Sequence, residues 1–289
     1  MAVRKKTPGN TVVERVAKSL DAVTKAQTPK NVHFFRTSCR RLEAFTDLSK
    51  GKNEAARALR KLFKWLDKPR RLAGRVRDLD VQLDLVRDLH FDGDHASRRR
   101  LRIDLQEARG RACRKFSKAL DPETIASLHR RLRKVERALA SATKPSAANS
   151  AADYRRRARS EALALLAALP EDFPSVEPAN LHRLRLAGKN IRYTAEQAFP
   201  DPEARRLAEA MKELQGAIGR WHDLLMLRKR TRDLTPEEGT LQRILRSHER
   251  ACLAGALRRG RHVVRPHATP PEKKLPAQAQ LPPAAATAS

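Results

Sequence analysis

Residues 29–42 read PKNVHFFRTSCRRL, and residues 178–191 read PANLHRLRLAGKNI. Four residue types occupy equivalent places at one constant offset, namely Pro29, Asn31, His33 and Arg36 in the first stretch and Pro178, Asn180, His182 and Arg185 in the second. A second pair follows later in each half, GRVRDL at 74–79 and GRWHDL at 219–224. Such self-similarity predicts an internal duplication.

The hydrophobic pattern is helical almost throughout. Apolar residues recur at Leu72, Val76, Leu79, Leu83 and Val86, and no stretch sustains the alternation of a strand. Phe, Trp and Tyr supply only 4% of the residues, which disfavours an aromatic-rich sandwich or barrel. We therefore expect an all-α protein made of two similar helical bundles.

Breaks in the pattern divide the chain. Prolines at positions 29, 69, 122, 178 and 202 predict helix boundaries. A small, polar stretch between the halves reads as a linker, and the Pro- and Ala-rich C-terminus lacks apolar periodicity. The expected organisation is a flexible N-terminus at 1–10, a first bundle at 11–145, a second bundle at 146–265 and a disordered tail at 266–289.

The repeated stretches predict two matching cationic helices. An asparagine after a proline-containing turn, at Asn31 and at Asn180, is a candidate N-cap. The residues that follow at i, i+3 and i+7 share one helical face, giving a stripe of His33, Arg36 and Arg40 and a second stripe of His182, Arg185 and Lys189. The apolar stripe lies roughly 110° away, so each basic stripe flanks the core and can line a cleft.

The charge balance indicates an anionic partner. Lys and Arg total 62 against 33 Asp and Glu, a formal net charge of +29. Nucleic acid, an anionic membrane and a phosphate polymer all fit that charge. A row of arginines suits a row of phosphates, because the planar guanidinium donates paired hydrogen bonds and stays charged.

Other repeated residues predict supporting roles. Asp78 and Asp223 follow a basic residue in each half and are poor anion ligands, so we expect them to orient neighbouring Arg or His side chains. Gly74 and Gly219 would let a helix or a ligand approach the backbone closely.

Several functional classes lack their signatures. The three cysteines show no CxxC pairing, which indicates neither a disulfide framework nor a zinc knuckle and favours a reducing compartment. The most apolar stretch, 162–169, is far shorter than the roughly 20 residues that span a bilayer, and no secretory signal is evident, so we expect a cytoplasmic protein without membrane association. No P-loop, GxSxG or HExxH motif occurs, so we expect no catalytic residues and no cofactor.

Four segments resemble one family, in the order VHFFRTSCRRLEAF, RLAGRVRDLDV, LHRLRLAGKNIRYTAEQ and ELQGAIGRWHDLLM. They are similar to the CHAD domain, the conserved histidine α-helical domain that binds inorganic polyphosphate, over about residues 31–248. The resemblance implies two four-helix bundles related by a pseudo-twofold, with a basic central groove or pore.

The resemblance also implies a set of polyphosphate-binding residues: His33, Arg36, Arg40, Arg41, Arg77, His182, Arg185, Lys189, Arg192, Tyr193 and His222. Two positions depart from the family pattern, because Glu43 replaces an arginine and Asn190 interrupts the second basic cluster. The family's frequent fusion partner, a triphosphate tunnel metalloenzyme, needs an ExExK strand, and this chain has no ExExK.

The functional expectation is polyphosphate binding without catalysis, at cytoplasmic polyphosphate granules. Granule-associated proteins, or a separate polyphosphate-metabolising enzyme, are the candidate protein partners, and a scaffold role at granules is compatible with this reading. The first alternative is a basic nucleic-acid-binding architectural protein, although few aromatic residues are available for base stacking. The second is a metal-binding module built from His33, His182 and the aspartates, which the surrounding cations oppose.

Overall fold

The computed structural model describes residues 8–48, 53–89, 95–142, 151–169, 178–232 and 239–264, and within these ranges it contains helices and no strand. The elements are α1 (Pro8–Lys25), α2 (Pro29–Leu48), α3 (Glu54–Asp88), α4 (His95–Lys118), α5 (Pro122–Ala142), α6 (Ala151–Ala167), α7 (Pro178–Glu196), α8 (Pro202–Thr231) and α9 (Thr240–Val264). The predicted all-α class is confirmed. None of these helices is both long enough and apolar enough to cross a membrane.

The two repeated stretches form α2 and α7, and each helix begins at its proline. The predicted asparagine caps are wrong, because Asn31 and Asn180 lie inside the first turn. In α2 the cap is Thr28, whose Oγ1 accepts a hydrogen bond from the backbone N–H of Asn31 at 3.2 Å. The Asn31 amide instead donates to the carbonyls of Ala22 and Ala26, at 3.0 and 2.9 Å, and so joins α2 to the end of α1. Proline suits the first helical position because its missing N–H would be unpaired there.

One predicted boundary is wrong. Pro69 lies in the interior of α3, which continues for 35 residues. An interior proline costs a helix about 3 kcal/mol through a lost hydrogen bond and a steric clash. The residues on both sides, including Leu66 and Ala73, are fully buried in a core, and this packing holds the helix together. By contrast, Pro122 and Pro202 each begin a helix, as expected.

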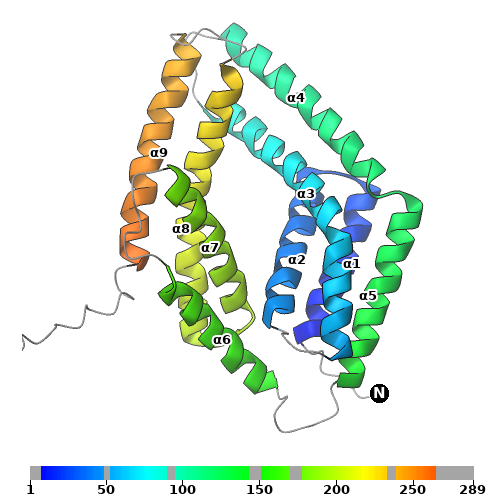
Figure 1. Ribbon diagram of the computed structural model, residues 1–289. Coiled ribbons are helices and arrows are strands. Elements are labelled where there is room, and N and C mark those ends of the chain that lie inside the picture. The colour runs from blue at the N-terminus through cyan, green and yellow to red at the C-terminus, as the bar shows by residue number, and fades with distance from the viewer. Residues whose placement is uncertain are drawn as a thin grey trace, which may run out of the picture.

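Three hydrophobic cores hold the helices (Figure 1). The first joins α1, α2, α3 and α5, together with Phe116 near the end of α4, whose ring centroid lies 5.9 Å from that of Phe35. The second joins α6, α7, α8 and α9 around Trp221. We call the elements α1–α5 the first half and α6–α9 the second half. The pseudo-twofold relation between them, and the predicted domain limits, stay predictions.

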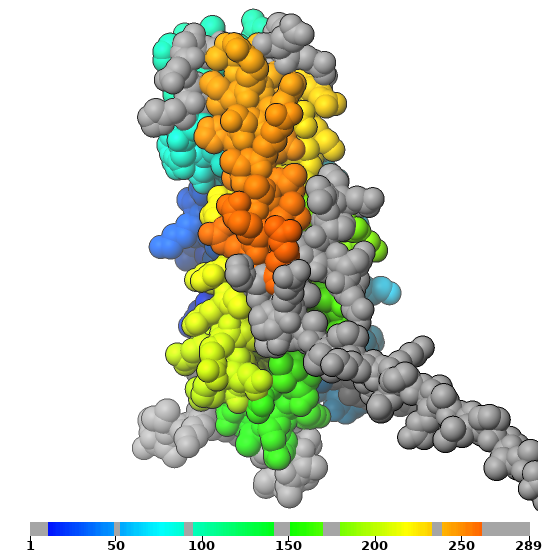
Figure 2. Space-filling view, turned by 90° about the vertical axis from the view of Figure 1, so that its left-hand side faces the viewer, coloured from blue at the N-terminus to red at the C-terminus, as the bar shows by residue number. Residues whose placement is uncertain are grey.

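The third core joins the two halves. It packs the C-terminal part of α3 and the N-terminal part of α4 against α8 and α9, through buried residues such as Val86, Leu105, Leu224 and Leu241. An ion pair between Arg230 of α8 and Asp104 of α4, with 2.6 Å between Nε and Oδ2, lies at the same junction. The outer face of the second half shows α9 above and parts of α8 and α6 below (Figure 2). Away from this junction, α2 packs against α7 and α6 (Figure 1).

The predicted linker and tail fall largely outside the described residues. Helix α5 ends at Ala142 and α6 begins at Ala151, so residues 143–150 are not described. Residues 1–7 and 265–289 are also outside the described ranges. Helix α1 begins at Pro8, within the segment predicted to be flexible.

Substitution at the third core tests its contribution. Leu105 is fully buried, so Leu105→Ala is expected to lower the free energy of unfolding by about 2–5 kcal/mol through lost apolar burial and a residual cavity. Ile103, two residues away on α4, is 45% exposed, and Ile103→Ala should cost less than about 1 kcal/mol. Urea unfolding measures both, and equal losses would contradict a packed junction between the halves.

Candidate functional site

The predicted binding residues come from four helices. α2 carries His33, Arg36, Arg40 and Arg41, α7 carries His182, Arg185, Lys189, Arg192 and Tyr193, α3 carries Arg77 and Asp78, and α8 carries His222 and Asp223. We call the eleven predicted ligand-binding residues, without the two aspartates, the basic cluster. Contacts between α2 and α7 and between α3 and α8 bring the four helices together.

Within the first half, Arg36 lies across α3 at Gly74. A Cβ atom at position 74 would stand 2.7 Å from Nη1 of Arg36, so only glycine leaves room for this placement. The same Nη1 atom lies 3.8 Å from Oδ1 of Asp78. Asp78 therefore sits where it can orient Arg36. Gly219, the equivalent residue of the second half, has open space at its Cβ position.

At the contact between α2 and α7, one carboxylate binds an arginine from each helix. Glu196 accepts a hydrogen bond from Nε of Arg41 at 2.8 Å and another from Nε of Arg192 at 3.0 Å. The ring of Tyr193 lies beside both guanidinium groups, whose central carbons are 5.8 and 5.2 Å from the ring centroid. Tyr193 is only 8% exposed. This arrangement fixes two cations of opposite halves next to each other.

Sequence reasoning missed Glu196, although a signal was present. It lies four residues after Arg192 on the same helix, the spacing at which an acid and a base meet on a helix surface. Its partner on α2, Arg41, is 155 residues away along the chain, so the contact between the halves depends on tertiary packing.

The cations of the two stripes act on one another across the halves. Burial, and then Arg185, Arg40 and Arg36, lower the pKa of Lys189 to about 7. Burial lowers the pKa of His33, and arginines from both halves lower it further, Arg192 of α7 among them. Because charge–charge interactions weaken with distance, cations of the two predicted stripes lie near one another in the structure.

The histidines of the second half form a pair. The ring centroids of His182 and His222 are 5.6 Å apart, and burial followed by the charge of His222 lowers the pKa of His182. Nδ1 of His222 lies 3.7 Å from Oδ1 of Asp223, beyond hydrogen-bonding distance. Among the residues that the structure describes, no three side chains of His, Cys, Asp or Glu converge as a metal ion would require.

Glu43, the predicted departure from the family pattern, engages the basic cluster directly. Its Oε2 atom lies 2.7 Å from Nη1 of Arg40 and 4.0 Å from Nη1 of Arg70. Arg40 is therefore already paired with a carboxylate, whereas no described residue forms an ion pair with Arg185 or Lys189. Arg185 and Lys189 are thus less engaged than Arg40.

A pocket of about 1060 Å³ opens between the halves, where the Glu196 contact forms part of its wall. Helices α1, α2, α6, α7 and α8 all contribute to it. Its charged residues are Arg15, Arg41, Arg155, Arg192, Lys212, Glu196 and Glu209. Sequence reasoning did not assign Arg15, Arg155 or Lys212 to the site. No local pattern identifies these three, because they come from separate helices.

The pKa of Lys189 gives a testable dependence of stability on pH. It is about 7 in the folded protein, below the ordinary value of 10.5. As pH drops, Lys189 is therefore protonated in the unfolded chain before it is protonated in the folded protein. The contribution of Lys189 to the free energy of unfolding falls as pH drops from about 10.5 towards 7, and it does not fall further below pH 7. In urea unfolding, we therefore expect the free energy of unfolding of Lys189→Met to rise relative to that of the wild type as pH drops from about 10.5 towards 7. Lys64→Met, at an exposed lysine of α3, should show a constant difference, and a constant difference for Lys189→Met would be contrary evidence.

Comparisons with known families and solved structures point to the family that the sequence resembles. The family model for the CHAD domain matches residues 10–232, and no curated protein matches the chain. The crystal structure of the CHAD domain from the plant Ricinus communis is similar with a TM-score of 0.58 at 20% identity, covering 92% of this chain and 93% of that one. PptA from Streptomyces chartreusis is similar with a TM-score of 0.50 at 15% identity, covering 91% and 99%. At these identities the two structures support the fold alone. Because the family match spans most of its length, the chain belongs to the CHAD domain family.

Proposed function

We propose that this protein binds inorganic polyphosphate along the basic cluster and does not transform it. The observation that carries the proposal is the convergence of two cationic stripes, one from each half, where α2 packs against α7. Burial, and then the charges of Arg185, Arg40 and Arg36, lower the pKa of Lys189, so cations of α2 act on a cation of α7. A polyanion lying along this contact would pair with cations of both helices at once.

The geometry suits a linear chain of phosphates better than a single anion. Cations are distributed from the His182 and His222 pair, past Lys189 and Arg36, to the Arg41 and Arg192 pair at the pocket. Binding there relieves the mutual repulsion of these cations and satisfies their free hydrogen-bond donors. Arginine supplies most of the donors, and its fork binds two phosphate oxygens at a time.

The positions of the nearby carboxylates support a binding role without catalysis. Glu196 is held between two arginines, and Asp78 lies beside Arg36. Both serve the positioning of cations, so we assign neither a role as a general base. We propose that any enzyme acting on the polymer is a separate chain, and that the protein resides with polyphosphate granules and their associated proteins.

Nucleic acid is the competing ligand, and the aromatic residues argue against it. Base stacking needs an accessible ring, whereas Tyr193 is 8% exposed and lies beside two guanidinium groups. Trp65 and Phe199 are 43% and 39% exposed, but an arginine lies over each ring, Arg131 over Trp65 and Arg205 over Phe199. Nonspecific attraction by the net charge of +29 is therefore the contact we expect with nucleic acid.

Competition binding tests the proposal. At about 0.15 M salt, where screening weakens loose contacts, long-chain polyphosphate should displace double-stranded DNA at equal phosphate concentration. Arg36→Ala combined with Arg185→Ala should weaken polyphosphate binding at least tenfold, because each lost charge-assisted hydrogen bond costs about 1.5–3 kcal/mol.

The matched control removes two charges elsewhere. Arg99 and Arg100 are exposed residues of α4, and their joint replacement by alanine should change the affinity by less than about threefold. Arg98 is unsuitable because its guanidinium donates to the carbonyls of Val86 and Arg87 and so holds the end of α3. Equal losses for the two double variants, or a preference for DNA, would show that only net charge is recognised.

A further inference from the structure

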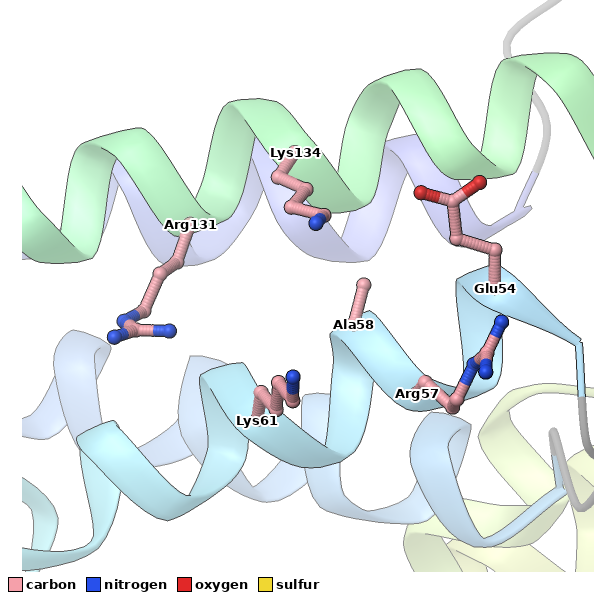
Figure 3. Close-up of a pocket in the computed structure, with 6 residues that line it drawn as sticks. All are labelled: Glu54, Arg57, Ala58, Lys61, Arg131 and Lys134. Atoms are coloured by element: carbon pink, nitrogen blue, oxygen red, sulfur yellow. The ribbon is translucent and has the colours of Figure 1, made fainter.

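A second group of cations lines a pocket on the first half, between α3 and α5 (Figure 3). The pocket has a volume of about 310 Å³ and is lined by Glu54, Arg57, Ala58, Lys61, Arg131 and Lys134. It shares no residue with the basic cluster. Helix α5 lies at the edge of the molecule, with α1, α2 and α3 between it and α7 (Figure 1).

Helical spacing explains why these residues meet. Glu54, Arg57, Ala58 and Lys61 stand at i, i+3, i+4 and i+7 of α3, which places them on one face. Arg131 and Lys134 are likewise three residues apart on α5, and α3 packs against α5. Ala58 is buried between them, and its single methyl group leaves the space that a longer side chain would fill.

The cations of this pocket are not neutralised by the described part of the chain. No described residue forms an ion pair with Arg57, Lys61 or Lys134. Three other arginines of α3, namely Arg70, Arg71 and Arg87, do pair with carboxylates within one turn, as in the pair of Arg71 with Asp67 at 3.0 Å. In the pocket, four cations face a single carboxylate, so like charges remain close together. An anion held among them would offset this repulsion.

Arg131 supplies a second, independent observation. Its Nε atom is buried and has no hydrogen-bond partner among the described residues. The guanidinium is held in place over the ring of Trp65, with 4.2 Å between its central carbon and the ring centroid. A buried N–H without a partner costs about 1–3 kcal/mol. Contact with the Trp65 ring therefore sets the position of this guanidinium in the wall of the pocket.

We propose that this pocket binds a compact oligophosphate of two or three phosphoryl groups, either free or as the phosphate tail of a nucleotide. The two lysines and two arginines match the several charges of such an anion, and the small volume excludes a long polymer lying within it. The site is separate from the basic cluster, so the proposal stands independently of polyphosphate binding there.

Calorimetric titration of the full chain with inorganic triphosphate tests the proposal. The starting protein carries Arg36→Ala and Arg185→Ala, which weakens the basic cluster. We expect it to bind triphosphate, and we expect the further changes Lys61→Ala and Lys134→Ala to weaken that binding at least tenfold. Adding Arg99→Ala and Arg100→Ala instead removes the same charge from α4 and should change the affinity by less than twofold. Circular dichroism checks that each variant remains folded.

Two results would overturn the proposal: no triphosphate binding by the starting protein, or equal losses from the two added pairs. The resonance of the Trp65 indole N–H should also shift on titration, because Arg131 contacts this ring. A parallel titration with ATP distinguishes the sources. Tighter binding of ATP than of triphosphate assigns the pocket to a nucleotide, and the reverse order assigns it to the free anion.

Discussion

Cations of one half lie within electrostatic reach of cations of the other half, and this repulsion must be overcome wherever α2 packs against α7. Two unit charges 4 Å apart repel by about 4 kcal/mol at the effective dielectric constant of a protein surface. The contact between α2 and α7 therefore needs stabilisation from other parts of the fold. Burial, and then the neighbouring cations of both halves, lower the pKa of Lys189 and that of His33.

Two features of the fold offset the repulsion. Glu196 places one negative charge between Arg41 and Arg192, and so joins a cation of each helix through one carboxylate. The third core supplies the rest, because it fastens the long helices α3 and α8 together with α4 and α9. Apolar burial between the halves thereby fixes them in place. The remaining cations, Arg185 and Lys189 above all, are then available to an anion.

Much of the fold and part of the site could be predicted from the sequence, and the differences have physical causes. Helical periodicity and the repeated motif located α2 and α7, since each signal can be read from a short stretch of sequence. The asparagine caps were misplaced because proline takes the first helical position and Thr28 caps α2, which leaves Asn31 free to bind α1. Pro69 did not end α3, because packing on both sides outweighs its local cost.

The site residues also divide into those that local sequence patterns predict and those that only the packing of the helices reveals. The stripes follow from spacing within one helix, and their convergence was inferred from the repeat. Arg15 and Lys212 could not be assigned, because their positions depend on how helices distant in the chain pack. The spacing of Glu196 from Arg192 was a local signal, but the contact of Glu196 with Arg41 was not. Similarly, Glu43 was recognised as a departure from the family pattern, but its pairing with Arg40 required coordinates.

A crystal structure with a short linear polyphosphate tests the central claim most directly. The claim is that cations from both halves hold one polyanion where α2 meets α7. Phosphate groups within hydrogen-bonding distance of Arg36 on one helix, and of Arg185 or Lys189 on the other, are the result expected. Phosphates bound only to one half, or only to the outer faces of the helices, with these three side chains unengaged, would contradict it.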